Sequence, residues 1–591
     1  MNPAGDNPGT MGRPWPGVDE NPWLRPHPIP DGRFSTGPGT SVPRHWSRPR
    51  ARPRRCVPSP FAVRPRPDAV TSILPSRLHS APSSNESPAR EARTGLPPWT
   101  TAELDAPPPR NWRQLLGPGI VMAGASLGAG EWLIGPAITA RYGGALLWIT
   151  LLTLLAQYIY NVEASRYTLA TGEGIMTGKL RLKPGSRFWT FTYLAIDFWT
   201  MLPFQLSAVA VTGAAMILGR IPDPASETGL MRQVTYVLLL LVPVPLIFGG
   251  TIYKFLKGLV MVKVFFVLGL LLVLAVCLAS WRSLGEVAWG FFQFGSLPAA
   301  NGQVVNVFGA WWRGEGFPSL DTESMKLFTT LAGIAGVGGL TQTSICAYTR
   351  EQGWGMGRKV GAIASMVGGE PVALAHSGVT FVPTPPALAR WRAWLRRVHL
   401  DQWQVWLPAS LIGLALPALI SIEVLPRGTT ADRWVLASLM AGGVETRIGG
   451  ALGHLLWHLM LICGFLVLFP VTITTVDGFL RRWVDIVWSS SGTLRRVDPH
   501  RVLRVYYGFL AAYVVMSAGF LAFASPLWLV VIAANVNNFA LGLSCFHTLA
   551  VNTRLLAPEL RPGQLSRAAL GASGAYFIGL AALTVWVIAN G

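Results

Sequence analysis

The chain has 591 residues, of which 51% are hydrophobic and 13% are charged. Soluble domains carry roughly 25% charged residues, so the composition excludes an ordinary soluble protein and predicts an all-α membrane protein. The formal net charge is +20, and much of it falls in the first 110 residues and in loops. Basic loops orient a membrane protein, so we expect membrane lipids as partners and no nucleic acid.

Residues 1–110 are predicted to form a disordered tail rich in Pro and Arg. The stretch "RPRARPRRCVPSPFAVRPRPDAV" typifies it, and its apolar content is too low for a packed core. No apolar segment follows its basic residues, as a signal peptide would require. Two origins stay open: a natural cytoplasmic tail beside anionic lipids, or sequence translated upstream of the true start.

The rest of the chain, residues 111–591, is predicted to be a transmembrane domain. Runs of about twenty apolar residues are long enough to cross a bilayer as helices. Eleven such spans are predicted near 114–140, 143–165, 189–219, 233–250, 258–280, 328–348, 403–425, 449–475, 503–524, 526–550 and 569–589. Lys and Arg are concentrated in the loops after the even-numbered spans, which predicts a cytoplasmic N-terminus in the plasma (inner) membrane.

Two of these spans are interrupted by glycines. Span 1 contains "GASLGAGEWLIGP", in which Glu131 is the only charge, and span 6 contains "GIAGVGGLTQTS". Five helices separate equivalent positions, as two inverted five-helix repeats would give. Paired, glycine-broken segments in corresponding halves indicate a transporter binding site. Close helix packing at small residues is the alternative interpretation.

The predicted binding site lies at these two interruptions. Its candidate residues are Gly128, Glu131, Gly339, Thr341, Gln342 and Thr343. One carboxylate with neutral oxygens suits a hard cation such as Mn²⁺ or Mg²⁺. Two other roles for Glu131 stay open: it carries a proton, its pKa raised by burial, or it binds the amine of an organic substrate.

Polar side chains elsewhere in the spans are predicted to serve a proton pathway or a gate, with simple helix–helix contacts as the alternative. They are Asp197, Glu163, His454, His458, Asn535 and Asn538. His454 and His458 stand four residues apart, a spacing that metal ligands on one helix face use. We expect no catalytic cluster and no cofactor, and therefore no enzyme.

Two segments carry a resemblance to a known family. The stretch "LLGPGIVMAGASLGAGEW" resembles the first helix of the Nramp family of proton-coupled divalent metal transporters, and "AQYIYNVEASRYTLATGEGIMTG" resembles its second helix and the following loop. The resemblance covers residues 111–591. It implies a LeuT-like fold of two inverted repeats, about 114–280 and 328–550, plus an extra helix near 569–589. It also implies ion-coupled alternating access.

The chain departs from that family at the metal ligands. The family's Asp-Pro-Gly-Asn is replaced here by residues 128–131, Gly-Ala-Gly-Glu, and its Met-Pro-His by Thr341, Gln342 and Thr343. The sequence therefore predicts a divergent Nramp-related branch with a Gly-x-Gly-Glu motif. We predict a monomeric secondary transporter of a hard divalent cation, coupled to protons by resemblance. The alternative is a LeuT-fold carrier of a small organic solute such as an amino acid or amine.

Overall fold

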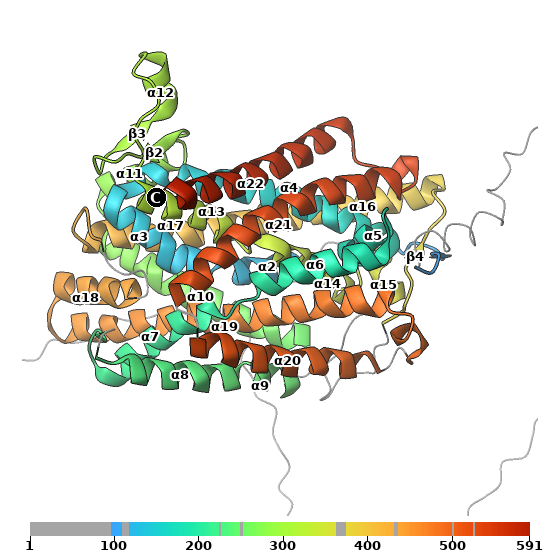
Figure 1. Cartoon of the computed structure of the whole chain (residues 1–591), viewed down its shortest axis with the longest axis horizontal. Coiled ribbons are helices and arrows are strands. Elements are labelled where there is room, and N and C mark those ends of the chain that lie inside the picture. Colours follow the sequence, from blue (N-terminus) through green and yellow to red (C-terminus); the bar gives the residue numbers. More distant parts are fainter. Residues whose placement is uncertain are drawn as a thin grey trace, which may run out of the picture. The chain divides into compact units, whose positions relative to one another are not determined.

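The computed structural model describes residues 96–108, 117–223, 226–248, 252–361, 374–430, 435–498, 501–523 and 526–590. The chain divides into two units, Met1–His79 and Ser80–Gly591, and every described residue belongs to the second unit. In that unit long helices run side by side in a bundle, with two short two-stranded sheets at its ends (Figure 1).

The first half of this unit contains β1 (Thr100–Thr101), α2 (Pro118–Ser126), the π-helical turn η2 (Gly130–Ile134), α3 (Gly135–Tyr142), η3 (Gly143–Leu146), α4 (Trp148–Thr171), α5 (Ile175–Leu180), α6 (Ser186–Thr200), α7 (Phe204–Leu218), α8 (Thr228–Leu241), α9 (Pro243–Phe248), α10 (Ile252–Leu278), α11 (Trp281–Gly290), β2 (Ser296–Pro298), β3 (Val304–Asn306) and α12 (Val307–Trp312). The second half contains α13 (Thr322–Ile334), the 3-10 turn η4 (Gly339–Thr343), α14 (Ser344–Glu351), α15 (Gly357–Val360), β4 (Val379–Thr380), α16 (Pro385–Asp401), η5 (Gln402–Trp406), α17 (Leu407–Val424), α18 (Leu436–Ile448), α19 (Gly450–Ser490), η6 (Leu494–Arg496), α20 (Val502–Phe523), α21 (Pro526–Arg554), η8 (Pro558–Leu560) and α22 (Gln564–Asn590).

Each of the eleven predicted spans contains helix, but the spans differ in continuity. By length and apolar composition alone, seven helices of the described part can cross a membrane, and an eighth is added if the bent pair Gly130–Leu146 and Trp148–Thr171 counts as one span. Spans 1 and 6 are not among these seven helices, because each is broken into pieces too short to cross a membrane on their own. Their longest pieces, α2 and α13, have 9 and 13 residues, fewer than the roughly twenty that a bilayer needs.

Span 3 also differs from its prediction as one long helix over 189–219. The structure divides it into α6 and α7, with Pro203 just before the second piece. Proline lacks the N–H that an α-helix needs and its ring obstructs the preceding turn, so a break here has a local cause. The break faces the same region as the breaks in spans 1 and 6, since residues of all three breaks line one cavity.

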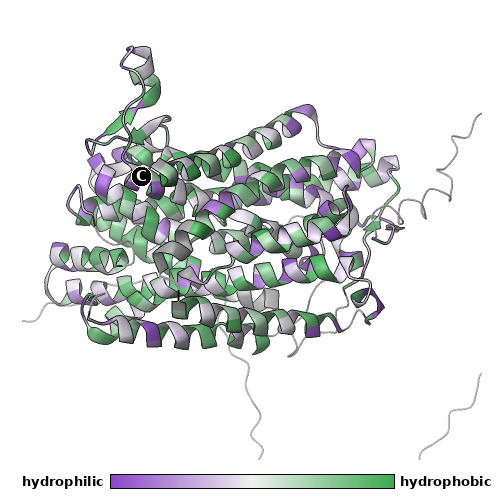
Figure 2. Ribbon diagram, in the orientation of Figure 1, coloured by the Kyte–Doolittle hydropathy of each residue, from purple (hydrophilic) through white to green (hydrophobic). Residues whose placement is uncertain are grey.

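The outer surface of the long helices is apolar. On α10 the side chains of Val262, Phe265 and Val276 are largely exposed, the last to 78%. Figure 2 shows apolar residues running along the helices and hydrophilic residues gathered toward their ends. Exposed apolar side chains along helices of membrane-spanning length are expected where lipid replaces water, which supports an integral membrane protein.

The segment before α2 is more ordered than the predicted 1–110 tail. Residues 96–108 lie on the bundle: Leu104 is fully buried, β1 pairs in parallel with β4, and the Trp394 indole Nε1 donates to the Asp105 carbonyl at 2.8 Å. The structure of these residues thus differs from the predicted disorder, because apolar side chains such as that of Leu104 are buried against the bundle. Residues 1–95 lie outside the described residues, and the prediction stays open for them.

Helices α2 and α10 approach each other closely at Gly124. A Cβ atom on Gly124 would stand 1.9 Å from Cγ1 of Val260 on α10. Glycines in membrane helices permit such close approach of two backbones. This contact brings the next turn of α10, which carries Lys263, against the end of α2.

Gly124→Ala is expected to lower the free energy of unfolding by about 1–3 kcal/mol, because the added methyl group overlaps Val260. Thermal unfolding of the detergent-solubilised protein measures this change. Gly269→Ala is the matched control, since Gly269 lies on α10, the helix that Gly124 contacts, with no atom within 4 Å of its Cβ position. Equal effects of the two substitutions would contradict the proposed close contact.

Candidate transport site between two broken helices

The side chains of Glu131 and Lys263 bond the backbone groups that the break in span 1 leaves without helical partners. In a continuous α-helix the amide of Gly128 would donate to the carbonyl of Gly124, four residues earlier. Here the Gly128 amide donates to Oε2 of Glu131 at 3.0 Å, and the Gly124 carbonyl accepts from Nζ of Lys263 at 2.8 Å. Lys263 also donates to the carbonyl of Leu127. The Glu131 carboxylate therefore accepts from the amide of Gly128, and the Lys263 ammonium donates to the carbonyl of Gly124. In a continuous helix these two backbone groups would bond each other.

The break in span 6 is stabilised in a related way. After α13 ends, the amide of Gly336 donates to Oε1 of Glu131 at 2.8 Å, and the carbonyl of Ala335 accepts from Nε2 of Gln157 at 2.9 Å. Gly336 has φ of +71°, a conformation open mainly to glycine. The backbone groups that a continuous helix would satisfy internally are thus satisfied by side chains of spans 1 and 2.

Glu131 joins the two breaks to each other. Its side chain is buried, and each carboxylate oxygen accepts from one break: Oε2 from Gly128 and Oε1 from Gly336. Gly130 lets the two breaks approach each other closely, since a Cβ atom on it would stand 2.8 Å from the carbonyl oxygen of Ile334. The Gly-x-Gly-Glu sequence therefore permits contact between the two broken backbones and supplies the acid that bridges them.

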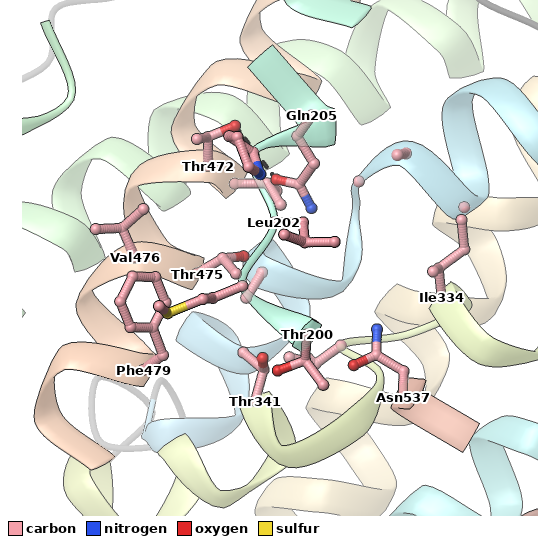
Figure 3. A pocket seen from close by; sticks show the side chains of 18 of the residues that line it. Thr200, Leu202, Gln205, Ile334, Thr341, Thr472, Thr475, Val476, Phe479 and Asn537 are labelled. Atoms are coloured by element: carbon pink, nitrogen blue, oxygen red, sulfur yellow. Dashed lines mark hydrogen bonds between the residues drawn. The ribbon is translucent and has the colours of Figure 1, made fainter. Parts of the chain in front are cut away.

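A cavity lies at the meeting point of the breaks in spans 1, 3 and 6. It has about 650 Å³, counted out to its open mouth, and it also touches α19, α20 and α21. Figure 3 shows side chains from these elements pointing into it, with Gln205 and Thr472 on one side and Thr200, Thr341 and Asn537 on another.

The described residues that line this cavity are all uncharged. Its polar groups are hydroxyls and amides, from Thr200, Gln205, Thr341, Thr472, Thr475, Tyr513 and Asn537. Its apolar groups include Ile334, Val337, Val471 and Phe479, and Met201 adds a thioether. Such a lining can hydrogen-bond a polar molecule and pack against its apolar part.

The predicted binding residues divide into two groups. Gly128 and Thr341 line the cavity. Glu131 lies beside it with both oxygens engaged, and a Cβ on Gly339 would stand 2.0 Å from Oδ1 of Asn537. Their roles in cargo binding stay predictions.

The remaining two predicted residues on η4 turn away from the cavity. Nε2 of Gln342 donates to Oε1 of Gln157 at 3.4 Å, and Oγ1 of Thr343 donates to the Leu340 carbonyl at 2.7 Å. Gln342 thus continues the polar contact with span 2 that begins at Gln157. The partner of Gln342 thus comes from span 2, and that of Thr343 from span 6 itself.

Asp197 lies directly next to the cavity wall. Its buried carboxylate accepts from Arg482 at 2.6 Å, from Nε1 of Trp483 at 2.8 Å and from the hydroxyl of Thr200, a lining residue, at 2.8 Å. Arg482 also donates to the Leu340 carbonyl at 2.8 Å. This ion pair connects span 3 to span 8 and to the break in span 6.

Further buried ion pairs join α14 to α19 beyond that point. Arg350 pairs with Asp485 at 2.6 Å, and Arg481 pairs with Glu351 at 2.5 Å. We call this region, defined by Arg350, Arg481 and Arg482, the arginine end. Because these pairs are buried and hydrogen-bonded, separating α14 from α19 there is energetically costly.

Three other predicted polar residues, Glu163, Asn535 and Asn538, are not among the residues that line the cavity. Glu163 pairs with Arg166 at 2.9 Å and accepts from Asn552 of α21 at 3.0 Å. Asn538 donates to the Thr329 carbonyl at 3.3 Å. Asn535 is half-buried on the same helix. Asn537, which lies between Asn535 and Asn538 in the sequence, lines the cavity instead.

The two predicted histidines lie at the far end of α19. His454 hydrogen-bonds Oε1 of Glu445 at 2.9 Å and is exposed to 63%. His458 precedes the lining residue Thr472 by fourteen positions, which is about 21 Å along a helix. Within the described ranges, no group of three or more His, Cys, Asp or Glu side chains is arranged to hold a metal ion.

Sequence reasoning missed Lys263 and Asp401. Lys263 was visible as a charge inside an apolar span, which is itself a signal of function. Asp401, at the end of α16, accepts from the amide of Gly119 at 2.7 Å and so caps the first turn of α2. Neither partner could be found by spacing, because both contacts join segments more than a hundred residues apart.

Comparison with known proteins gives a likeness of fold. No family model matches the chain, and no curated protein matches it. A crystal structure of the Eremococcus coleocola manganese transporter, in complex with an aromatic bis-isothiourea substituted compound, is 13% identical and covers 83% of this chain and 99% of that chain, with a TM-score of 0.50. The chain has a LeuT-like fold.

Two further structures are similar. A histidine-to-alanine mutant of the same manganese transporter is 13% identical, with 83% of this chain and 98% of that chain covered and a TM-score of 0.50. Mhp1, a nucleobase-cation-symport-1 family transporter, is 12% identical over 83% of this chain and 95% of that chain, with a TM-score of 0.42. The likeness confirms the predicted LeuT-like fold and leaves the cargo undetermined.

Glu131→Gln is expected to lower the free energy of unfolding by about 1–3 kcal/mol. The amide keeps one acceptor oxygen, so one of the two backbone amides at the breaks loses its partner. Thermal unfolding in detergent measures the loss. Glu315→Gln, at an acid that is 54% exposed, is the matched control and should leave the midpoint unchanged. A Glu131→Gln variant as stable as wild type would show that the carboxylate does not hold the breaks.

Proposed function

We propose that the chain is a secondary active transporter whose cargo binds in the cavity between the broken helices and is carried by alternating access. The observation that carries this proposal is the convergence of the breaks in spans 1, 3 and 6 on one cavity. Irregular backbone within a membrane is tolerated where it is buried in protein or lines a watered cavity. Discontinuous helices meeting at mid-membrane are typical of transporter binding sites.

The cargo that the lining favours is a small polar organic solute without net charge, or a zwitterion. Pockets that bind small molecules combine apolar walls with a few polar groups that fix the ligand's orientation, and this cavity is lined in that way. Its mixture of hydroxyls, amides and apolar side chains resembles such sites. A dehydrated divalent cation prefers a cage with carboxylate oxygens, and the described lining supplies neutral oxygens.

A divalent cation that keeps part of its water is the second candidate. Two observations favour it: the negative charge of Glu131 lies three residues from the lining residue Gly128, and the fold resembles that of a manganese transporter. The thioether of Met201, also in the lining, would suit a soft transition metal. Water molecules would then supply most of the contacts to the ion.

Alternating access requires the arginine end to open. The pairs Arg350–Asp485 and Glu351–Arg481 hold α14 against α19, on the side of the cavity that we assign to the cytoplasm. Release of cargo on that side requires these pairs to separate and to be hydrated. Closure on the opposite side would accompany it, as one repeat rocks against the other.

Uptake into liposomes of purified protein tests this function. Radiolabelled zwitterionic amino acids are compared with Mn²⁺ and Mg²⁺, each under an imposed pH gradient. We expect organic uptake, reduced about tenfold in Thr341→Val through loss of one hydrogen bond to the cargo. Thr446→Val, at an exposed threonine of α18, should transport like wild type.

Each alternative result has a definite meaning. Mn²⁺ or Mg²⁺ uptake without organic uptake would reject the organic cargo in favour of the second candidate. No uptake of either class under any gradient would reject the transporter itself. Uptake that Thr341→Val and Thr446→Val reduce equally would remove the cavity from the pathway.

A further inference from the structure

Lys263 is a buried ammonium within a membrane span. It lies on α10, in a segment of 21 residues, Gly258–Leu278, that is long and apolar enough to cross a bilayer. Its side chain is fully buried. An ionisable group in this position is costly and needs specific partners, so it is a functional candidate by default.

The partners of Lys263 are carbonyl oxygens that the break in span 1 leaves free. Nζ donates to the carbonyl of Gly124 at 2.8 Å and to that of Leu127. Both lie at the C-terminal end of α2, where the carbonyl groups and the helix dipole present negative charge. Two backbone carbonyls at a helix C-terminus, within a membrane protein, form the kind of site that coordinates a monovalent cation in transporters with broken helices.

The surroundings of Lys263 isolate it from other charges. Leu127, Val260, Val264 and Leu268 form an apolar cluster beside it. Helix α10 packs against α2, α17 and α19. Among the described groups, the titratable side chain whose charge acts on Lys263 is Glu131, the acid that bridges the two breaks. The ammonium thus has one counter-charge and two carbonyl ligands.

We propose that the ammonium of Lys263 is a built-in monovalent cation of the span 1 break, which takes the place of an inorganic coupling ion. The site exchanges a proton in place of a metal ion: Lys263–NH₃⁺ gives H⁺ to water and leaves a neutral amine, and H⁺ from water restores the ammonium. This inference rests on the proposed transporter function and names its coupling ion.

The geometry explains how proton exchange would move a helix. The charged amine attracts the carbonyl end of α2 and offsets the charge of Glu131. Loss of the proton removes that cation, so the end of α2 is held less tightly against α10. Ala125 and Gly128, next to the two carbonyls, line the cavity. Movement of α2 therefore changes the binding site and opens a path for water to the amine.

Thermal unfolding in detergent tests the cation site without any cargo. Wild type and Lys263→Ala are compared in NaCl, ethylammonium chloride and choline chloride at equal ionic strength. In Lys263→Ala the empty site should bind Na⁺ or ethylammonium, giving a saturable rise in midpoint over choline. Wild type should give no difference between the three salts.

Lys179→Ala is the matched control. Lys179 is also a fully buried lysine, but its ammonium contacts Ser544 and lies over the ring of Tyr193, away from the break. It should give no ion-specific rise. The proposal is overturned if Lys263→Ala shows no ion-specific rise, or if Lys179→Ala or wild type shows an equal one.

Lys263→Arg tests the proton step and serves if the alanine variant does not fold. Arginine keeps the charge but does not release its proton, so the variant should bind the cargo found in the liposome experiment and lose about tenfold or more of its uptake. Uptake by Lys263→Arg at the wild-type rate under a pH gradient, or wild-type uptake driven by a Na⁺ gradient alone, would overturn proton coupling at this site. If no cargo is transported at all, the proposed function fails while the salt-dependent unfolding still decides the cation site.

Discussion

The carboxylate of Glu131 is the contact on which the rest of the site depends. Its two oxygens accept from the amides of Gly128 and Gly336, which belong to breaks in two different helices. Without an acceptor for these amides, the breaks would leave unpaired donors in a buried region, and regular helix would be the more stable state. Lys263 completes the arrangement by donating to the carbonyl that the first break frees.

This use of Glu131 separates the acid from the surface that would hold the cargo. The cavity beside the breaks is lined, in the described part of the chain, by uncharged residues. Charged groups are instead placed around it: Glu131 and Lys263 at the break in span 1, Asp197 and Arg482 between spans 3 and 8. Under the proposed function, a neutral surface with charged supports is suited to recognising a polar solute.

Part of this site could be predicted from the sequence because its signals are local. The glycines of spans 1 and 6 and the lone acid Glu131 stand out in apolar segments, and the structure places breaks at both. The break in span 3 was signalled by Pro203, yet the apolar run on either side indicated one helix. The likeness in fold confirms the LeuT-like prediction made from two short motifs.

The rest could not be predicted because it depends on contacts between distant segments. Gly336 and Glu131 are 205 positions apart, and Lys263 and Gly124 are 139 apart. Whether an acid in a span faces a cavity, a cation or a backbone amide depends on the rotation of its helix and on the close approach that Gly124 permits. Composition carries no information about that rotation, so the two amide partners of Glu131 could not be predicted.

An electron cryo-microscopy map of the protein in lipid nanodiscs, with the transported cargo added, tests the central claim most directly. The account predicts that helix 1 is interrupted between Ser126 and Gly130 and helix 6 between Ile334 and Gly339, with the Glu131 carboxylate on both breaks and cargo density beside Gly128 and Thr341. Two continuous helices, with the amide of Gly128 on the carbonyl of Gly124, would contradict it.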